Sequence, residues 1–315
     1  MGWRNAIASG LLVLPATVYA QSACQIKDTA VFEPQGKTIA LVSSANSEND
    51  IIVFRSKLRV NTDGAPNSYH PEDLNGSTQA INNIANGVGV RNEEDGKSVS
   101  YAELIKVFEE FRDNNWEVPE GYRINWRNVL AARKVAGRTI PCVFQSGEHK
   151  GYFGSLTALK NGLSGDKAGE CEVANQLDER FVPALVMAGG KNPLKHFQAI
   201  VGDLVLALNP ANNAVTAAVI GDTGPDDNLG EGSVALNMAL LKRDKQPTNY
   251  KEAKQLDTGK QIIAVAIIPG SRAYKLQRPY SAENIKTRVT EWAAEQGYGS
   301  FANFAAFILK CSEQL

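Results

Sequence analysis

The sequence lacks the motifs of several common enzyme and binding classes. It has no Gly-x-Ser-x-Gly motif, which excludes the nucleophile elbow of many hydrolases. It has no Cys-x-x-Cys pair and no histidine spaced as a ligand beside a cysteine, which argues against a zinc site. Its formal net charge is only −1, whereas nucleic-acid binding needs a concentrated positive field. No repeat, low-complexity tract or Pro/Gly/Ser-rich linker divides the chain, so we expect one continuous domain.

The N-terminus has the pattern of a secretory signal peptide. Arg4 supplies a positive charge, residues 6–18 are largely apolar, and small residues up to Ala20 form a cleavage site. No later apolar run is long enough to cross a bilayer. We therefore expect residues 1–20 to be removed and residues 21–315 to form a secreted or periplasmic protein without a membrane anchor. The alternative is a retained amphipathic N-terminus.

All four cysteines follow the predicted cleavage site. In an oxidising compartment an even number of cysteines suggests disulfides, and four cysteines allow three pairings. We favour Cys142 with Cys171 across the middle of the chain, and Cys24 with Cys311 between its two ends.

Apolar segments rich in β-branched residues dominate the parts of the chain that carry motifs. Bounded by turn formers, they predict strands at 37–43, 51–54, 181–187, 199–208, 215–220 and 261–268. Several are apolar on both faces, which suits the central strands of a closed or covered sheet. The stretch from Asn209 to Asn213 is typical of a tight connection between two strands.

Two helices are clear from their periodicity. Ser100 and Glu103 form a capping-box pattern before one apolar stripe, and a second stripe lies near the end of the chain. The two stripes consist of Leu104, Val107, Phe108 and Phe111, and of Ile285, Val289, Trp292 and Ala293. A third helix is expected at 231–241. The sequence therefore predicts an α+β fold with a β-rich, barrel-like sheet core and peripheral helices.

The most informative feature for function is a pair of carboxylates. An apolar run delivers Asp222 onto a Gly/Pro loop, and Glu231 follows nine residues later at the start of the predicted third helix. Glycoside hydrolysis needs one protonated carboxyl to donate to the leaving oxygen and one ionised carboxylate to activate water or attack the sugar. A helix N-terminus would favour the charged form of Glu231, so an acid role requires burial or a neighbouring Asp. The alternative to a catalytic pair is a structural role, in which Asp222 forms an Asx turn and Glu231 favours the start of a helix.

The surroundings of this pair carry a resemblance to a known family. Gly221, Asp222, Thr223, Gly224 and Pro225 are followed by Gly230, Glu231, Gly232 and Ser233, and preceded by Gly202, Asp203 and Leu204 and by Val182 and Pro183. Together they resemble the core signature of the secreted chitosanases of glycoside hydrolase family seventy-five. Weaker matches occur at 58–64, 68–73, 154–157 and 268–271, so the resemblance spans roughly residues 51–271.

The resemblance implies that Asp222 and Glu231 act by inversion. We take Glu231 as the general acid and Asp222 as the general base, with the reverse assignment open. Two departures stand out: Gly232 replaces an expected larger, helix-favouring residue, and residues 91–139 resemble an insertion.

Further side chains near these motifs are candidates for substrate binding. They are Asp203, Tyr69, His70, Tyr152 and Thr223. For His70 the alternatives to substrate binding are a metal site with Asp63 and a structural role in a turn before proline. For Asp203 the alternative is a structural role. No cofactor and no metal are implied, and we expect a monomer whose partner is a polysaccharide.

These patterns predict an endo-glycosidase that hydrolyses β-1,4 linkages of an amino-sugar polymer such as chitosan. A peptidoglycan glycosidase or lytic transglycosylase is one alternative, and a non-catalytic cell-wall-binding protein is another. A cleft for chitosan, which carries ammonium groups, should be strongly acidic. A cleft for peptidoglycan, which brings carboxylates, should be wider and carry Arg or Lys. The sequence does not place Lys191, Lys195 or Arg272 relative to a cleft.

Overall fold

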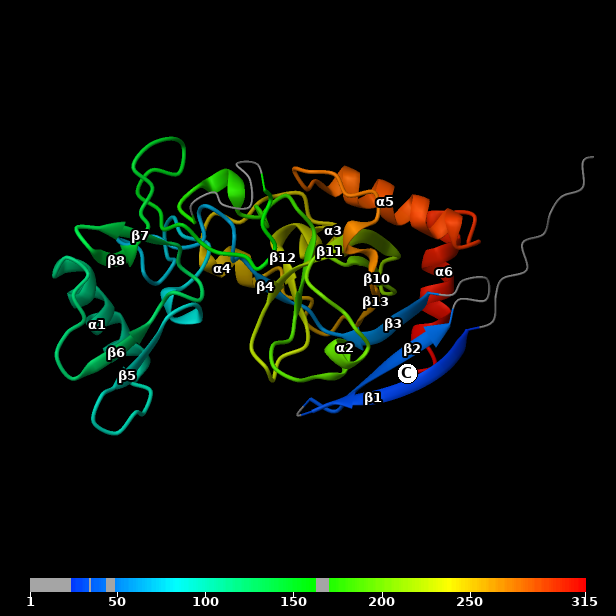
Figure 1. Cartoon of the computed structure of the whole chain (residues 1–315), viewed down its shortest axis with the longest axis horizontal. Coiled ribbons are helices and arrows are strands. Elements are labelled where there is room, and N and C mark those ends of the chain that lie inside the picture. Colours follow the sequence, from blue (N-terminus) through cyan, green and yellow to red (C-terminus); the bar gives the residue numbers. More distant parts are fainter. Residues whose placement is uncertain (1–23, 34, 44–48, 163–169) are drawn as a thin grey trace, which may run out of the picture.

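The computed structural model describes residues 24–33, 35–43, 49–162 and 170–315. The predicted signal peptide, residues 1–20, lies outside them. Within the described residues, nine strands form one curled, barrel-like sheet with helices around it, which confirms the predicted α+β class (Figure 1). In sheet order the strands are β1 (Gln25–Phe32), β2 (Lys37–Ser43), β3 (Asp50–Ser56), β13 (Ile263–Ile268), β10 (Leu204–Asn209), β11 (Ala214–Thr223), β9 (Ala184–Met187), β12 (Glu231–Ser233) and β4 (Arg59–Asn61).

The short link between β3 and β4 requires the sheet to curl. Only Lys57 and Leu58 separate these strands in sequence, although β4 lies at the far edge of the sheet from β3. Successive Cα atoms are about 3.8 Å apart, so β4 must come back to within a few residues' reach of β3. Leu58 closes this junction, because its N–H donates to Thr258 Oγ1 at 2.9 Å and its carbonyl accepts from the Thr258 N–H at 2.9 Å.

The sheet is buried on both faces because its central strands are apolar throughout. Every residue of β10 and of β13 is buried. One face packs against α5 (Ala282–Glu295) and α6 (Phe301–Ser312). The opposite face forms a second cluster, which includes Phe54, Leu185 and Leu236. These are the two-sided apolar runs from which the strands were predicted.

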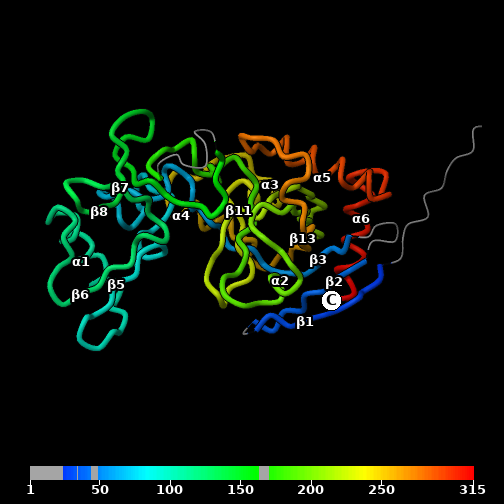
Figure 2. The backbone as a smooth tube through the Cα atoms, viewed as in Figure 1, coloured from blue at the N-terminus to red at the C-terminus, as the bar shows by residue number. Residues whose placement is uncertain are grey.

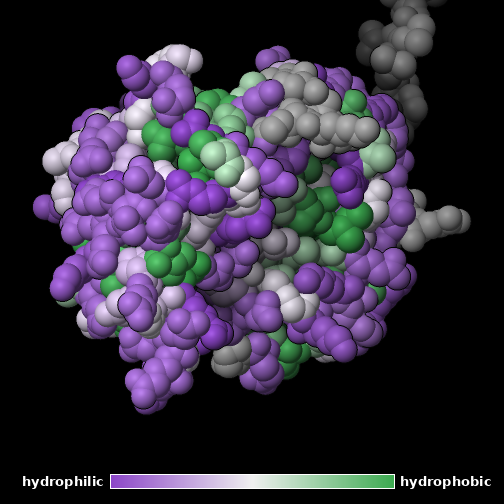
Figure 3. All heavy atoms as spheres, turned by 60° about the vertical axis from the view of Figure 1, so that its left-hand side comes forward, coloured by the Kyte–Doolittle hydropathy of each residue, from purple (hydrophilic) through white to green (hydrophobic). Residues whose placement is uncertain are grey.

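A separate group of elements lies beside the sheet, away from α5 and α6 (Figures 1 and 2). We call residues 69–153 the α1 lobe. Its elements are η1 (Ile84–Asn86), β5 (Gly89–Asn92), α1 (Tyr101–Asp113), β6 (Tyr122–Asn125), β7 (Ala132–Val135) and β8 (Arg138–Pro141). The buried stripe of α1 packs with Trp126 and Phe153 into a core of its own, while the surface on this side is mostly hydrophilic (Figure 3). The predicted insertion, residues 91–139, falls within this lobe.

The remaining helices are short. They are η2 (Val173–Asn175), α2 (Pro193–His196), α3 (Val234–Leu241), α4 (Tyr250–Lys254) and η3 (Ser271–Ala273). Among the described residues, no helix combines the length and apolar character that a membrane-spanning segment requires.

Two disulfides tie the fold together, in the pairing favoured from the sequence. Cys24 bonds to Cys311, which joins the start of β1 to the last turn of α6, and the C-terminus lies beside β1 in Figure 1. Cys142 bonds to Cys171, which joins the chain after β8 to the segment before η2.

Candidate active site

Asp222 and Glu231 emerge from the sheet on either side of one residue. Asp222, near the end of β11, pairs with Val186 of β9, and Glu231, the first residue of β12, pairs with the same Val186. Register partners in a sheet present their side chains on the same face. Because strands lie roughly 4.8 Å apart, the two carboxyl-bearing residues are separated by roughly 10 Å at the backbone.

Glu231 lies on a strand, so the prediction of a helix over 231–241 was wrong at its start. The helix α3 begins only at Val234, and Ser233 caps it by accepting a hydrogen bond from the Leu236 N–H. Residues 231–233 are extended because β9 and β4 both supply backbone partners for them. The helix N-terminus therefore does not act directly on Glu231.

Gly232, the departure from the family pattern, is explained by close packing. A Cβ atom at this position would lie 2.6 Å from Asn237 Oδ1 and 2.9 Å from Leu236 Cδ2. Both contacts are shorter than van der Waals distance, so a larger residue would displace these buried side chains of α3.

The two carboxyl groups open into a cleft of about 900 Å³ between the sheet and the α1 lobe. The sheet contributes residues of β4, β9, β11 and β12, and the lobe contributes Tyr69, Asn82, Asn86, Asn128 and Val129. Thr223, predicted to bind substrate, also lines the cleft, as does Lys195. Lys191 and Arg272 are not among its lining residues.

Asp222 is held by the backbone and has an altered pKa. Its Oδ1 accepts hydrogen bonds from the N–H groups of Ala158 at 2.9 Å and Thr223 at 2.8 Å. Burial raises the pKa of Asp222 to about 6, against the lowering effects of these hydrogen bonds and of Lys160. Asp222 is therefore ionised at neutral pH and loses its charge under mildly acidic conditions.

Glu231 is oriented by Asn228, whose Nδ2 donates to Oε1 at 2.5 Å. Burial raises the pKa of Glu231, whereas the Asn228 hydrogen bond and the charges of Arg59 and Lys254 lower it. Burial, rather than a neighbouring Asp, is the main effect that favours the protonated form. Arg59 is the register partner of Glu231 on β4, on the side opposite Val186.

Asp63 is a third carboxyl group in the cleft, and sequence reasoning assigned it no role beyond a metal alternative with His70. It follows β4, and its Oδ1 accepts from the Tyr69 hydroxyl at 2.8 Å. Burial, followed by the charge of Asp222, raises the pKa of Asp63 to about 8. Its place in the match at 58–64 was the only sequence indication, because Asp63 lies far along the chain from Asp222.

Glu179 is a fourth carboxyl group, located behind the cleft. Its side chain is completely buried, and neither carboxyl oxygen has a hydrogen-bond partner among the described residues. Burial, followed by the charges of Asp222 and Asp63, raises the pKa of Glu179 well above its usual range. In the sequence it lies between Asp178 and Arg180 and resembles a surface charge run.

Asp203, predicted to bind substrate, does not line the cleft. It is fully buried, and its carboxylate accepts the backbone N–H groups of Ile200 and Arg272, both at 3.0 Å. These bonds connect the turn before β10 to η3. This position agrees with a structural role for Asp203, the alternative to substrate binding.

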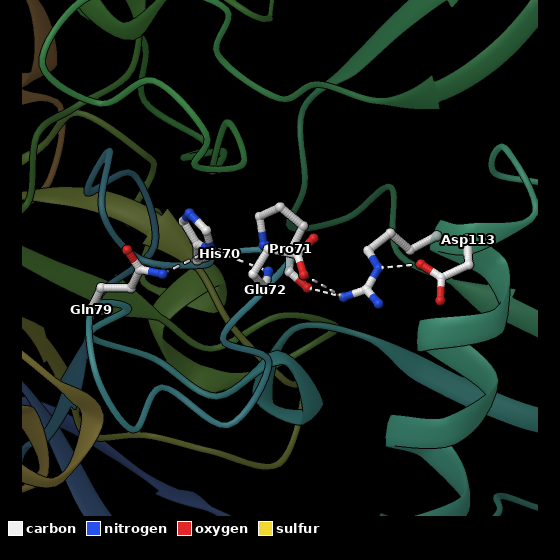
Figure 4. Close-up of polar contacts among 6 residues, drawn as sticks. His70, Pro71, Glu72, Gln79 and Asp113 are labelled. Atoms are coloured by element: carbon white, nitrogen blue, oxygen red, sulfur yellow. Dashed lines mark hydrogen bonds and ion pairs between the residues drawn. The ribbon is translucent and has the colours of Figure 1, made fainter.

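His70 and Tyr152 also lie outside the cleft lining. His70 Nδ1 accepts from the Glu72 N–H at 3.1 Å and lies next to Gln79, within a turn that Arg112 anchors by donating to the Pro71 carbonyl at 2.6 Å (Figure 4). Tyr152 packs edge-on against His70, with ring centroids 4.8 Å apart. Among the described residues, no cluster of three or more His, Cys, Asp or Glu side chains is arranged to hold a metal ion.

The cleft thus contains three carboxyl groups whose pKa values burial raises, to about 6 for Asp222 and to about 8 for Asp63. This combination suits reactions in which one group donates a proton while another accepts one. Tyr69, the remaining candidate, borders the cleft, but its hydroxyl is committed to Asp63 and Asn82. No protein-family model matches the chain, and no curated protein matches it.

Proposed function

We propose that this protein is a glycoside hydrolase that cleaves β-1,4 linkages within an amino-sugar polymer by direct attack of water. The observation that carries the proposal is the placement of Asp222 and Glu231 on either side of Val186, facing one cleft. Inverting glycosidases hold their two carboxyl groups roughly 6.5–9.5 Å apart, which leaves room for a water molecule. A backbone separation of roughly 10 Å allows this distance when the side chains lean toward each other.

In this mechanism Glu231 is the general acid and Asp222 the general base. Burial raises the pKa of Glu231, which favours the protonated form that an acid needs. Asp222, with a pKa of about 6, is ionised at pH 7 and is able to take a proton from water. Its two backbone donors hold one oxygen, which leaves the other for the water.

We propose further that the protein works outside the cytoplasm. Two disulfides are typical of proteins from an oxidising compartment, and the N-terminal pattern predicts export.

A peptidoglycan glycosidase is the second candidate, and the charges in the cleft favour it. The cationic residues on the cleft lining are Arg59, Lys160, Lys195 and Lys254, and the acidic ones are Asp63, Asp222, Asp226 and Glu231. A cleft selected for a polycation would carry an excess of carboxylates, whereas in this one cationic residues are as numerous as acidic ones, and Asp63 among the acidic ones is neutral at pH 7. The cations are able to pair with the carboxylates of peptidoglycan stems.

Release of reducing ends from chitosan and from purified peptidoglycan tests both candidates. We expect the wild-type protein to release reducing ends from one or both, and Glu231→Gln to release almost none. Asp227→Asn is the matched control, because Asp227 lies on the loop between Asp222 and Glu231, is exposed and does not line the cleft. Absence of products from both polymers with correctly folded wild-type protein would support the non-catalytic alternative.

A further inference from the structure

Asp63 presents one carboxyl oxygen to the cleft in a fixed orientation. Asn82 Nδ2 donates to the Tyr69 hydroxyl at 2.8 Å, and this hydroxyl donates to Asp63 Oδ1 at 2.8 Å. The donor and acceptor of both hydrogen bonds are therefore fixed, because an amide nitrogen only donates. Ser155 Oγ lies 3.5 Å from the same Oδ1, and its hydroxyl accepts from the Gly64 N–H at 3.0 Å. The Tyr69 and Ser155 contacts are both made through Oδ1.

The other oxygen, Oδ2, has no hydrogen-bond partner among the described residues, yet it is not a buried, unsatisfied atom. It is therefore accessible from the cleft that Asp63 lines. The pKa of about 8 means that Asp63 is neutral at pH 7. Since Oδ1 accepts the Tyr69 hydrogen, the proton of the neutral acid belongs on Oδ2. Asp63 is then an O–H donor facing the cleft.

The neighbouring carboxylates already have cationic partners within the protein. Lys160 acts on Asp222, and Arg59 and Lys254 act on Glu231, in each case lowering the pKa. Cations of the protein therefore already stabilise the charged forms of Asp222 and Glu231, so a positive charge on the substrate would add little. An ammonium group beside Asp63 would have to displace its proton and approach these cations.

We propose that Asp63 is a specificity residue that donates a hydrogen bond from Oδ2 to an acceptor oxygen of the bound glycan. The subsite beside it would then take an N-acetylated sugar rather than a sugar with a free amine. An acetamido carbonyl accepts a hydrogen bond, whereas an ammonium group has only donors. This inference rests on the proposed function, because it assumes that the cleft binds an amino-sugar chain.

Calorimetric titration of the full chain with two defined oligomers tests the inference. The Glu231→Gln background prevents consumption of the ligands, which are the fully N-acetylated and the fully deacetylated β-1,4 glucosamine hexamers. We expect the acetylated hexamer to bind roughly tenfold tighter at pH 7, the effect of one well-placed hydrogen bond. Added Asp63→Ala should remove this preference. Added Asp63→Asn should keep it, because Asn retains an acceptor for Tyr69 and places an N–H donor where Oδ2 was.

The pH dependence provides a second readout that a merely structural role would not change. The groups acting on Asp63 are Asp222, Tyr69, Glu231 and Ser155, and the charge of Asp63 in turn raises the pKa of Glu179. Affinity for the acetylated hexamer should fall between pH 7 and pH 9 as Asp63 ionises, and Asp63→Asn should abolish this fall.

Three results would overturn the inference. Tighter binding of the deacetylated hexamer than of the acetylated one at pH 7, lost on Asp63→Asn, would mean that Asp63 binds an ammonium group as a carboxylate. Equal binding of both hexamers, unchanged in both Asp63 variants, would remove Asp63 from recognition while leaving the proposed function intact. Failure of both hexamers to bind folded protein would overturn the inference and count against a chitosan-like substrate, whereas cleavage of peptidoglycan is tested separately by the release of reducing ends.

Discussion

Asp222 and Glu231 flank the same residue, Val186, from opposite sides in the sheet. The distance between them is therefore set by two strand spacings and by backbone hydrogen bonds, rather than by the loop that joins them in sequence. Catalytic groups on strands are held more precisely than groups on loops. The loop has a different role, because Asn228 within it orients the Glu231 carboxyl group.

Substitution of either carboxyl group should abolish most activity without unfolding the protein. We expect Asp222→Asn and Glu231→Gln each to lower turnover by roughly two or more orders of magnitude, since each removes a proton-transfer group. The thermal midpoint should stay nearly unchanged, because the Asp222→Asn side chain would keep an acceptor oxygen for the N–H groups of Ala158 and Thr223. Steady-state kinetics and thermal unfolding measure the two effects. Near-wild-type turnover in either variant would remove that residue from the mechanism.

Activity should fall below about pH 6, the pKa of Asp222 in the folded protein, because a protonated Asp222 is unable to accept a proton from water. Lys160 lowers this pKa, so Lys160→Met should raise it and move the acidic limb of the kcat/KM profile to higher pH. Lys195→Met is the matched control, since Lys195 lines the cleft but is not among the main causes of the Asp222 shift. A limb that stays in place in Lys160→Met, or moves equally in both variants, would argue against Asp222 as the base.

Glu179 should make the protein less stable as the pH rises. Its pKa in the folded state is raised, so the folded state binds more protons than the unfolded state above the usual pKa of a Glu. The free energy of unfolding then decreases with pH from about 4.5 upward, until Glu179 ionises in the folded state. Glu179→Gln removes this loss, so it should retain a higher thermal midpoint than wild type at pH 8 to 9. A parallel decline of both proteins would show that Glu179 is not buried in its neutral form.

Much of the scaffold was predictable because its signals are local. The predicted segments correspond to β2, β3, β9, β10, β11 and β13, and the two apolar stripes to α1 and α5. β12 was not predictable in this way. Its sequence, Glu231 to Ser233, contains glycine and has no alternating pattern, and it is extended only because β9 and β4 lie beside it. Tertiary pairing therefore determined the conformation of the residue that matters most for the site.

The remaining carboxyl groups needed the three-dimensional structure. Asp63 lies near Asp222 because β4, β12, β9 and β11 are consecutive strands of the sheet, and Glu179 is buried where α3 and the end of β11 meet its segment. Conversely, Asp203, His70 and Tyr152 have motif neighbours in the sequence but lie outside the cleft lining. Proximity to a motif along the chain does not determine whether the side chain of a turn residue faces the cleft.

The two disulfides should differ in their contribution to stability. Cys24 and Cys311 are 287 residues apart, and Cys142 and Cys171 are 29 apart. In the chain-entropy model the longer loop is worth roughly 2 kcal/mol more. The double variant Cys24→Ser/Cys311→Ser should therefore lose more free energy of unfolding than Cys142→Ser/Cys171→Ser in denaturant titrations. Equal losses, or the reverse order, would contradict this expectation, and free thiols in the exported protein would contradict both disulfides.

The stereochemistry of the product tests the geometry of the pair directly. If a water molecule occupies the space between Asp222 and Glu231, it attacks the sugar from the face opposite the leaving oxygen. The new reducing end should then appear first as the α anomer, because the cleaved linkage is β. Proton NMR of the nascent product distinguishes the anomers before mutarotation.

Other products would point to other mechanisms at the same site. A β anomer that appears first would indicate retention, either through a covalent intermediate, which needs carboxyl groups about 5–5.5 Å apart, or through participation of the sugar's own acetamido group. Such a distance disagrees with two strand spacings between Asp222 and Glu231. A 1,6-anhydro product from peptidoglycan would instead indicate lytic transglycosylation, in which the sugar's own hydroxyl replaces water. In that case Glu231 would still be needed as an acid, but no water would have to fit beside Asp222.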